Sequence, residues 1–211
     1  LRGLGIPHLR VLAAAHVHDA GALLQAAVAD DDPVLFVENK LLYPQPLLLA
    51  PETALAGGGT LHRSETPDRD GYPVVTLRNY AGAEPPDVTL ITYGGMSRLV
   101  VPVLEHMAGE EVRVLACLPA SISPLDPAPL VVAAGESGRL LIVEESQAAF
   151  GWGAEVAAAV QAARDGQSPL LVRRLGAQPT VIPAAKPLED QVLVSVEAIE
   201  GAILALLQAP S

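Results

Sequence analysis

The 211-residue sequence predicts an α/β fold, with a mostly parallel twisted sheet flanked by helices and preceded by a partial βαβ unit. Three observations lead to this prediction. From residue 87 onward, short apolar runs alternate regularly with longer helical segments. The short runs lack internal polar alternation, which is typical of parallel strands covered by helices on both faces. Half of the residues are hydrophobic, so the chain can form a sizeable core.

The first 50 residues predict one βαβ unit. The apolar run 8–15 indicates a buried strand, and 18–30 has helical spacing with Asp19 as its N-cap. Acidic residues before Pro33 end the helix, and 33–39 indicates a second strand. A unit this small cannot cover both faces of a sheet alone. We therefore expect further strands from elsewhere and association of the chain, most simply as a dimer.

The next segment, 51–86, predicts a linker between an N-terminal domain remnant (1–50) and a C-terminal domain (87–211). Prolines and a charged turn interrupt the apolar pattern, and only 72–78 has the composition of a short strand. The glycine triplet at 57–59 follows no predicted strand and opens no predicted helix. We therefore interpret it as flexible linker rather than as a phosphate-binding loop.

The C-terminal domain is predicted to alternate four strands with four helices, and a proline-rich loop precedes the final helix. In chain order these elements are strand 87–94, helix 96–109, strand 112–118, helix 127–138, strand 139–145, helix 154–166, strand 169–176 and helix 196–208.

Charge and composition exclude several functions. Against 24 acidic residues stand 13 lysines and arginines, and a net charge of −11 repels nucleic acid. The sequence contains no apolar stretch of about 18 residues and no signal-peptide pattern, so we expect no membrane span and a cytoplasmic location. The single cysteine, Cys117, excludes an internal disulfide and is expected to be a buried structural thiol.

Two polar clusters are candidates for chemistry. His16 and His18, beside Asp19, could hold a divalent metal with a third ligand. No partner pattern accompanies them, so a structural role is the preferred interpretation. Glu144 and Glu145 follow a strand, but adjacent strand residues point to opposite faces and cannot act together as acid and base. One of the two is expected to cap a helix or to lie in an interface.

The run Gly151-Trp152-Gly153 lies between a predicted strand and a predicted helix, where backbone amides could meet an anion. Tight packing of the strand against the helix explains the same glycines. The sequence contains no GxSxG, HExxH or Walker motif. The residues alone therefore predict a fold without a complete catalytic set.

Seven segments, taken in order, resemble one family. Together they are similar to the beta subunit of the thiamine-diphosphate-dependent 2-oxo acid dehydrogenases of the pyruvate or branched-chain type, whose C-terminal domain is like that of transketolase. The segments are DAGALL (19–24), DDPVLFVENKLLY (31–43), DVTLITYG (87–94), SPLD (123–126), GRLLIVEE (138–145), FGWGAEV (150–156) and IPAAKPLE (182–189).

The resemblance implies that residues 1–50 are the closing part of the family's pyrimidine-binding domain and that the sequence is N-terminally truncated relative to the family. The implied activity is oxidative decarboxylation of a 2-oxo acid with acyl transfer to lipoamide. Thiamine diphosphate and Mg²⁺ would be held in the intact assembly rather than by this chain alone. The cofactor-activating glutamate maps outside these residues, so no catalytic or cofactor-binding residue is assigned and the chain is expected to be inactive alone.

The resemblance also implies a K⁺ site at the end of the first helix, built largely from main-chain oxygens of Ala27, Val28, Asp30 and Asp32. A helix C-terminus leaves carbonyl groups unsatisfied and carries partial negative charge, which suits a hard cation.

The partners that the resemblance implies are the alpha subunit of the dehydrogenase and the dihydrolipoyl acyltransferase, in a homo- or hetero-oligomer. Asp190 and the C-terminal carboxylate of Ser211 are candidates for docking a basic partner, and the net charge of −11 is compatible with such steering. The alternative function is a standalone, non-catalytic interaction module derived from the same family.

Overall fold

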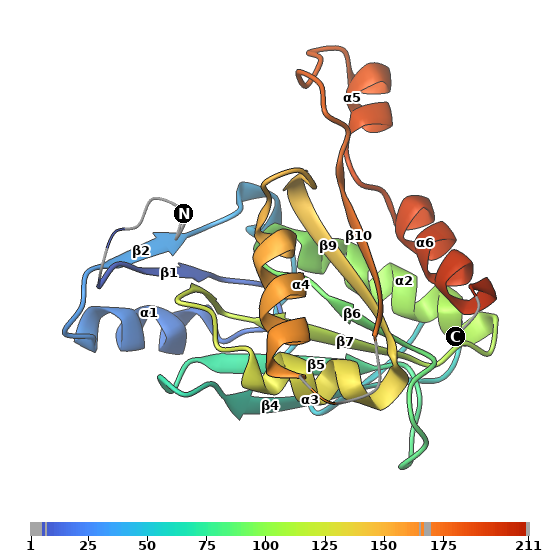
Figure 1. Cartoon of the computed structure of the whole chain (residues 1–211), viewed down its shortest axis with the longest axis horizontal. Helices are drawn as coiled ribbons and strands as arrows, with labels where there is room; N and C mark the ends of the chain where they lie inside the picture. Colours follow the sequence, from blue (N-terminus) through green and yellow to red (C-terminus); the bar gives the residue numbers. More distant parts are fainter. Residues whose placement is uncertain (1–5, 7, 165, 167–169, 210–211) are drawn as a thin grey trace.

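The computed structural model describes residues 6, 8–164, 166 and 170–209 (Figure 1). The strands are β1 (Arg10–Ala13), β2 (Val34–Val37), β3 (Glu52–Ala54), β4 (Thr60–Pro67), β5 (Pro73–Arg78), β6 (Val88–Ile91), β7 (Val114–Pro119), β8 (Ser121–Ser123), β9 (Arg139–Gln147) and β10 (Leu171–Ala177). The helices are α1 (Ala20–Ala29), α2 (Ser97–Gly109), α3 (Ala128–Ser137), α4 (Trp152–Ala163), α5 (Lys186–Val192) and α6 (Val196–Gln208), with short 3-10 turns η2 (Lys40–Leu42) and η3 (Gly94–Met96).

The N-terminal βαβ unit forms as predicted. The Asp19 side chain caps α1 by accepting a hydrogen bond from the amide of Ala22 at 3.0 Å. β1 pairs in parallel with β2, and on its other side it pairs antiparallel with β8. The additional strand that this small unit needs therefore comes from residues 121–123 of the same chain.

The larger sheet has the order β10-β9-β6-β7-β5-β4-β3, and its first four strands are parallel. The pleat of β7 divides its side chains between two cores. Val114, Ala116 and Leu118 face one core, whereas Leu115 and Cys117 face the other. All of these strand residues are buried, and Cys117 is wholly inaccessible, which confirms its prediction as a structural thiol.

Helices cover both faces of the parallel strands, as the absence of polar alternation predicted. α2 and α6 pack against each other and supply the first core, whereas α3 and α4 supply the second. Figure 1 shows this layered arrangement, with the small β2-β1-β8 sheet at one side of it. The fold is therefore the α/β class expected from the sequence.

The prediction of a linker with one short strand at 51–86 needs correction. This segment contains β3, β4 and β5, which extend the large sheet in antiparallel fashion from β7. The polar composition of β4 hid it, because Leu61 is its only buried residue. The glycine triplet forms the turn between β3 and β4, where Gly58 and Gly59 have φ of 97° and 86°. The division into domains at these boundaries stays a prediction.

A second difference lies in the segment expected to be a proline-rich loop. It contains α5, which projects away from both sheets (Figure 1). Pro187 stands in the first turn of α5, where a missing amide hydrogen breaks no helical bond. Among the described residues, no helix has the length and apolar character needed to cross a membrane.

Candidate functional site

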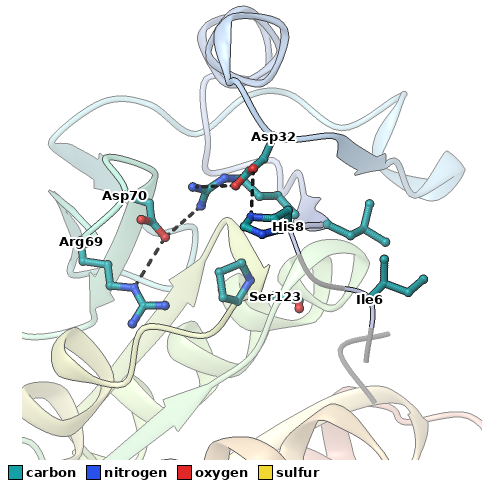
Figure 2. A pocket seen from close by; sticks show the side chains of 9 residues that line it. Ile6, His8, Asp32, Arg69, Asp70 and Ser123 are labelled. Carbon is teal, nitrogen blue, oxygen red and sulfur yellow. Dashed lines mark ion pairs between the residues drawn. The ribbon is translucent and has the colours of Figure 1, made fainter. Parts of the chain in front are cut away.

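The end of α1 borders a cleft between the N-terminal unit and the turn that joins β4 to β5. The cleft has a volume of ≈ 370 Å³. Figure 2 shows Asp32 and Asp70 on opposite sides of it, with His8 beside Asp32 and Ser123 at its edge. Residues from three distant parts of the chain therefore meet at this place.

A single guanidinium organises the carboxylates of the cleft. Arg10 places Nε 2.8 Å from Oδ2 of Asp30, Nη1 2.9 Å from Oδ2 of Asp70 and Nη2 3.4 Å from Oδ2 of Asp32. The hydroxyl of Tyr72 donates to Asp30 at 2.5 Å, and this hydrogen bond is the main cause that lowers the pKa of Asp30. The Arg10 side chain is only 17% exposed, so these ion pairs are partly shielded from water.

The four residues predicted to bind K⁺ lie at this helix end. Main-chain oxygens in the last turn of a helix suit a hard cation, as expected from Ala27 and Val28. The carboxylates of Asp30 and Asp32 face the Arg10 guanidinium, whose single positive charge they share with Asp70. The K⁺ site built from main-chain oxygens at this helix end stays a prediction.

The predicted docking residues are separated from this cleft. Asp190 lies on α5, where its side chain is 59% exposed and its Oδ1 is 2.8 Å from Nζ of Lys186. Ser211 lies outside the described residues. The docking prediction stays untested.

Glu144 caps a helix, which was one of its two expected roles. Its side chain is wholly buried, and its carboxylate accepts hydrogen bonds from Ser146 Oγ at 2.8 Å and from the amide of Gly153 at 3.3 Å. Arg174 Nη2 lies 3.7 Å from the same carboxylate. Glu145 points to the opposite, exposed face and accepts from Nδ2 of Asn39 at 3.2 Å.

The glycines around Trp152 make room for this buried carboxylate. A Cβ at Gly151 would lie 2.0 Å from Oε2 of Glu144, and one at Gly153 would lie 2.7 Å from Oε1. Close packing of the strand against the helix therefore explains both glycines.

The histidine pair is structural. Nδ1 of His16 is 2.8 Å from Oγ of Ser97, and His18 bonds through Nε2 to the carbonyl of Leu118 at 3.0 Å. Nδ1 of His18 accepts from the amide of Ala15, so its ring is neutral. Burial lowers the pKa of His18 to about 4. In the part of the chain that the structure describes, no three His, Cys, Asp or Glu side chains are grouped to hold a metal.

A second pocket, of ≈ 770 Å³, lies at the carboxyl ends of β6 and β9 beside the start of α4. Sequence reasoning missed it. It is lined by Tyr93, Phe150 and Trp152, in a chain that has only four tyrosines, two phenylalanines and one tryptophan. The scarcity of aromatic residues, together with the closeness of Phe150 to Trp152, was a signal that could have found this pocket.

These features define an α/β domain whose helices cover both faces of parallel strands and whose clefts lie at the strand ends and beside the N-terminal unit. The buried polar groups described above are engaged in structural contacts. Residues 82–199 match the family model described as "Transketolase, C-terminal domain", which is more than half of the chain. The chain therefore belongs to this family.

Individual relatives agree with the resemblance seen in the sequence. The chain is 31% identical to "Pyruvate dehydrogenase E1 component subunit beta-1, mitochondrial" of Arabidopsis thaliana, over 92% of this chain and 50% of that protein. It is 27% identical to "2-oxoisovalerate dehydrogenase subunit beta" of Bacillus subtilis, over 96% of this chain and 57% of that protein. The chain thus spans about half the length of the curated relatives it matches, and the predicted relationship to these beta subunits is confirmed.

A solved structure shares the fold. The structure titled "Split gene transketolase, inactive beta4 tetramer" superposes with a TM-score of 0.65 at 18% identity, over 96% of this chain and 59% of that one. At this identity the likeness concerns the fold alone.

Proposed function

We propose that this chain is part of the beta subunit of a thiamine-diphosphate-dependent 2-oxo acid dehydrogenase, namely the part that contains the C-terminal domain. The assembly would oxidatively decarboxylate a 2-oxo acid and transfer the acyl group to lipoamide. The observation that carries the proposal is alignment with beta subunits over more than nine-tenths of this chain, together with the family match at 82–199.

Within that assembly the chain acts as a scaffold. The Glu144 carboxylate is committed to Ser146 and Gly153, and the Asp30 carboxylate is committed to Arg10 and Tyr72. These contacts support a structural role for both carboxylates. Thiamine diphosphate and Mg²⁺ would accordingly be held by the intact assembly, where they supply the chemistry of decarboxylation.

K⁺ would bind at the end of α1 through main-chain oxygens of Ala27, Val28, Asp30 and Asp32. Its effect would be to fix the turn between α1 and β2. The alpha subunit and the dihydrolipoyl acyltransferase are the proposed partners, and the net charge of −11 favours docking of a basic surface.

Reconstitution tests this proposal. The chain is mixed with an alpha subunit and with the beta-subunit segment that precedes the matched region in the relatives. Reduction of a dye that depends on pyruvate or a branched-chain 2-oxo acid is then followed with thiamine diphosphate and Mg²⁺ present. We expect turnover only when this chain is included, and a rate equal to that of the mixture without it would contradict the proposal.

The scaffold role has its own test. Calorimetric titration of the chain alone with thiamine diphosphate and Mg²⁺ is expected to give no saturable heat. Micromolar binding, or turnover of a 2-oxo acid by the chain without companions, would contradict that role while leaving the family membership intact.

A further inference from the structure

The small sheet is closed at one edge and open at the other. Its order is β2-β1-β8, so β8 covers one side of β1 and β2 forms the outer edge. Among the described residues, no strand pairs with the outer side of β2. Figure 1 shows this strand at the outer margin of the N-terminal unit.

The backbone of β2 presents hydrogen-bonding groups at this edge. The carbonyl of Val37 accepts from the amide of Ala14 at 3.3 Å, on the side of β1. Along a strand in a parallel pair, successive residues direct their amides and carbonyls to opposite sides. The amides and carbonyls of Val34 and Phe36 therefore point away from β1. A row of such groups is a template for another strand.

The side chains of β2 are those of a strand that is covered on both faces. All four are apolar. Val34 and Phe36 pack against the core beneath α1. Leu35 and Val37 point to the opposite face, where they are 42% and 36% exposed. The strand contains no proline, charged residue or bulge, which are the features that keep natural edge strands from pairing.

Helix α1 adds an apolar flank to this edge. Leu24 and Val28 are exposed and stand one helical turn apart. Each directly follows a buried residue of the helix, Leu23 or Ala27. With the right-handed crossover that is usual for parallel strands, this flank lies on the side of β2. Exposed apolar residues of the helix and of the strand therefore border the same edge.

A second copy of the chain supplies a matching strand if the two β2 edges pair about a two-fold axis perpendicular to the sheet. Such an axis makes the two strands antiparallel and keeps both α1 helices on the same face. The outward backbone groups meet when Phe36 lies opposite Phe36 of the second copy. In this register Leu35 lies opposite Val37 of the second copy, so the exposed apolar residues cover one another.

The charges that flank β2 are complementary in this arrangement. Asp32 lies two residues before the strand and the exposed Lys40 lies three residues after it. Pairing about Phe36 therefore brings each Asp32 to the level of Lys40 of the other copy, which gives two opposite-charge contacts. Pairing about Leu35 would instead set Lys40 against Asp30, whose carboxylate is already engaged by two side chains.

From these observations we propose that the chain forms a two-fold dimer in which β2 pairs antiparallel with β2 of a second copy. The two small sheets become one sheet of six strands. Backbone hydrogen bonds and the contact of Leu35 with Val37 hold the copies together, and the pairing of Asp32 with Lys40 fixes the register. Four residues per strand give a small interface, so the association is reversible.

Sedimentation equilibrium of the chain alone, over a range of concentrations, measures this association. We expect a reversible equilibrium between monomer and dimer. Hydrogen exchange followed by nuclear magnetic resonance locates the contact. The amides of Val34 and Phe36 should become protected as the dimer forms, because these are the groups that point away from β1.

A charge on the open face of β2 tests the position of the interface. Leu35→Lys should weaken the dimer by about tenfold or more, because a lysine on an edge strand opposes pairing. Val132→Lys is the matched control, since it adds the same charge at an exposed apolar position on α3. This control should leave the dimer unchanged. Circular dichroism checks that both variants keep the fold.

A second pair of variants tests the register. Lys40→Glu places a carboxylate opposite Asp32 of the other copy and should weaken the dimer, most strongly at low salt, where the repulsion is least screened. Lys40→Arg keeps the charge and should keep the affinity. Lys186→Glu makes the same charge change on the projecting helix α5 and should have a smaller effect.

Three outcomes would overturn the proposal. Sedimentation as a monomer at every concentration would exclude the dimer. A dimer that Leu35→Lys leaves intact would place the contact on another face. Protection of the Val34 and Phe36 amides only after addition of the beta-subunit segment that precedes the matched region in the relatives would assign the edge to that segment. None of these measurements depends on turnover of a 2-oxo acid, so failure here leaves the proposed function untouched.

Discussion

Gly151→Ala should destabilise the protein by driving the Glu144 carboxylate out of its buried position. The new Cβ would lie 2.0 Å from Oε2 and 2.5 Å from Cδ of Glu144. Gly151 has φ of −75° and ψ of 168°, which alanine adopts without strain, so the effect is steric. Displacement breaks the hydrogen bonds from Ser146 and Gly153 to a charged acceptor, which are worth about 1.5–3 kcal/mol each in general.

Because the bond from Gly153 is long, we expect a loss of about 3–4 kcal/mol in the free energy of unfolding, which includes the N-cap preference for glycine over alanine. Urea unfolding followed by circular dichroism and by Trp152 fluorescence measures this quantity. The matched background is Glu144→Ala, in which the obstructed group is gone. There Gly151→Ala should cost only about 1 kcal/mol, the capping preference itself.

The steric explanation is tested by comparing the cost of Gly151→Ala in the protein that keeps Glu144 with its cost in the Glu144→Ala variant. A cost of Gly151→Ala that is the same with and without the Glu144 carboxylate would refute the steric reasoning. A loss below about 1 kcal/mol in the otherwise unchanged protein would do so as well, since the capping preference alone accounts for that much.

Three further effects are expected. The pKa of His18 is about 4 in the folded protein and higher in the unfolded chain, so the unfolded chain binds more protons. The free energy of unfolding should therefore fall by about 3 kcal/mol as the pH drops from about 6.5 to 4. In unfolding titrations, His18→Gln should remove this part of the pH dependence. Burial raises the pKa of Cys117 to about 12, so its thiol should react with a disulfide reagent only after denaturation, and rapid labelling of the native protein would contradict its placement. Arg10→Gln leaves the neighbouring carboxylates without their cation and should lower the free energy of unfolding by about 2–3 kcal/mol, less than the loss for a fully buried ion pair. Adding Asp70→Asn to this variant should restore part of the lost stability, as measured by thermal unfolding.

The sequence predicted the parallel part of the fold well because its signal is local. The run at β7 contains six consecutive buried residues, a pattern that burial on both faces of a sheet requires. β4 gives no such signal, because one face of this antiparallel extension meets solvent and its polar residues resemble those of a loop. The helix α5 was hidden by prolines at 183 and 187, although a proline in the first turn is compatible with a helix.

The candidate sites were harder to predict because their residues are distant in sequence. Arg10 meets Asp30 and Asp70, which lie 20 and 60 positions further along the chain, and only the folded chain brings them together. Tyr93 joins Trp152 in the same way. By contrast, the roles of Glu144 and the glycines beside Trp152 followed from strand pleat and neighbouring position, so sequence reasoning could reach them.

The pairing of β1 with β8 bears on how the polypeptide could be divided. Ala13 donates its amide to the carbonyl of Ala120 at 2.8 Å, and the guanidinium of Arg63 binds the carbonyl of Val17 at 2.9 Å. Hydrogen bonds therefore hold the first forty residues to the rest of the chain independently of the peptide segment that connects the two parts. A gene interrupted near Gln45 would still be expected to yield two fragments that reassemble into one particle when produced together.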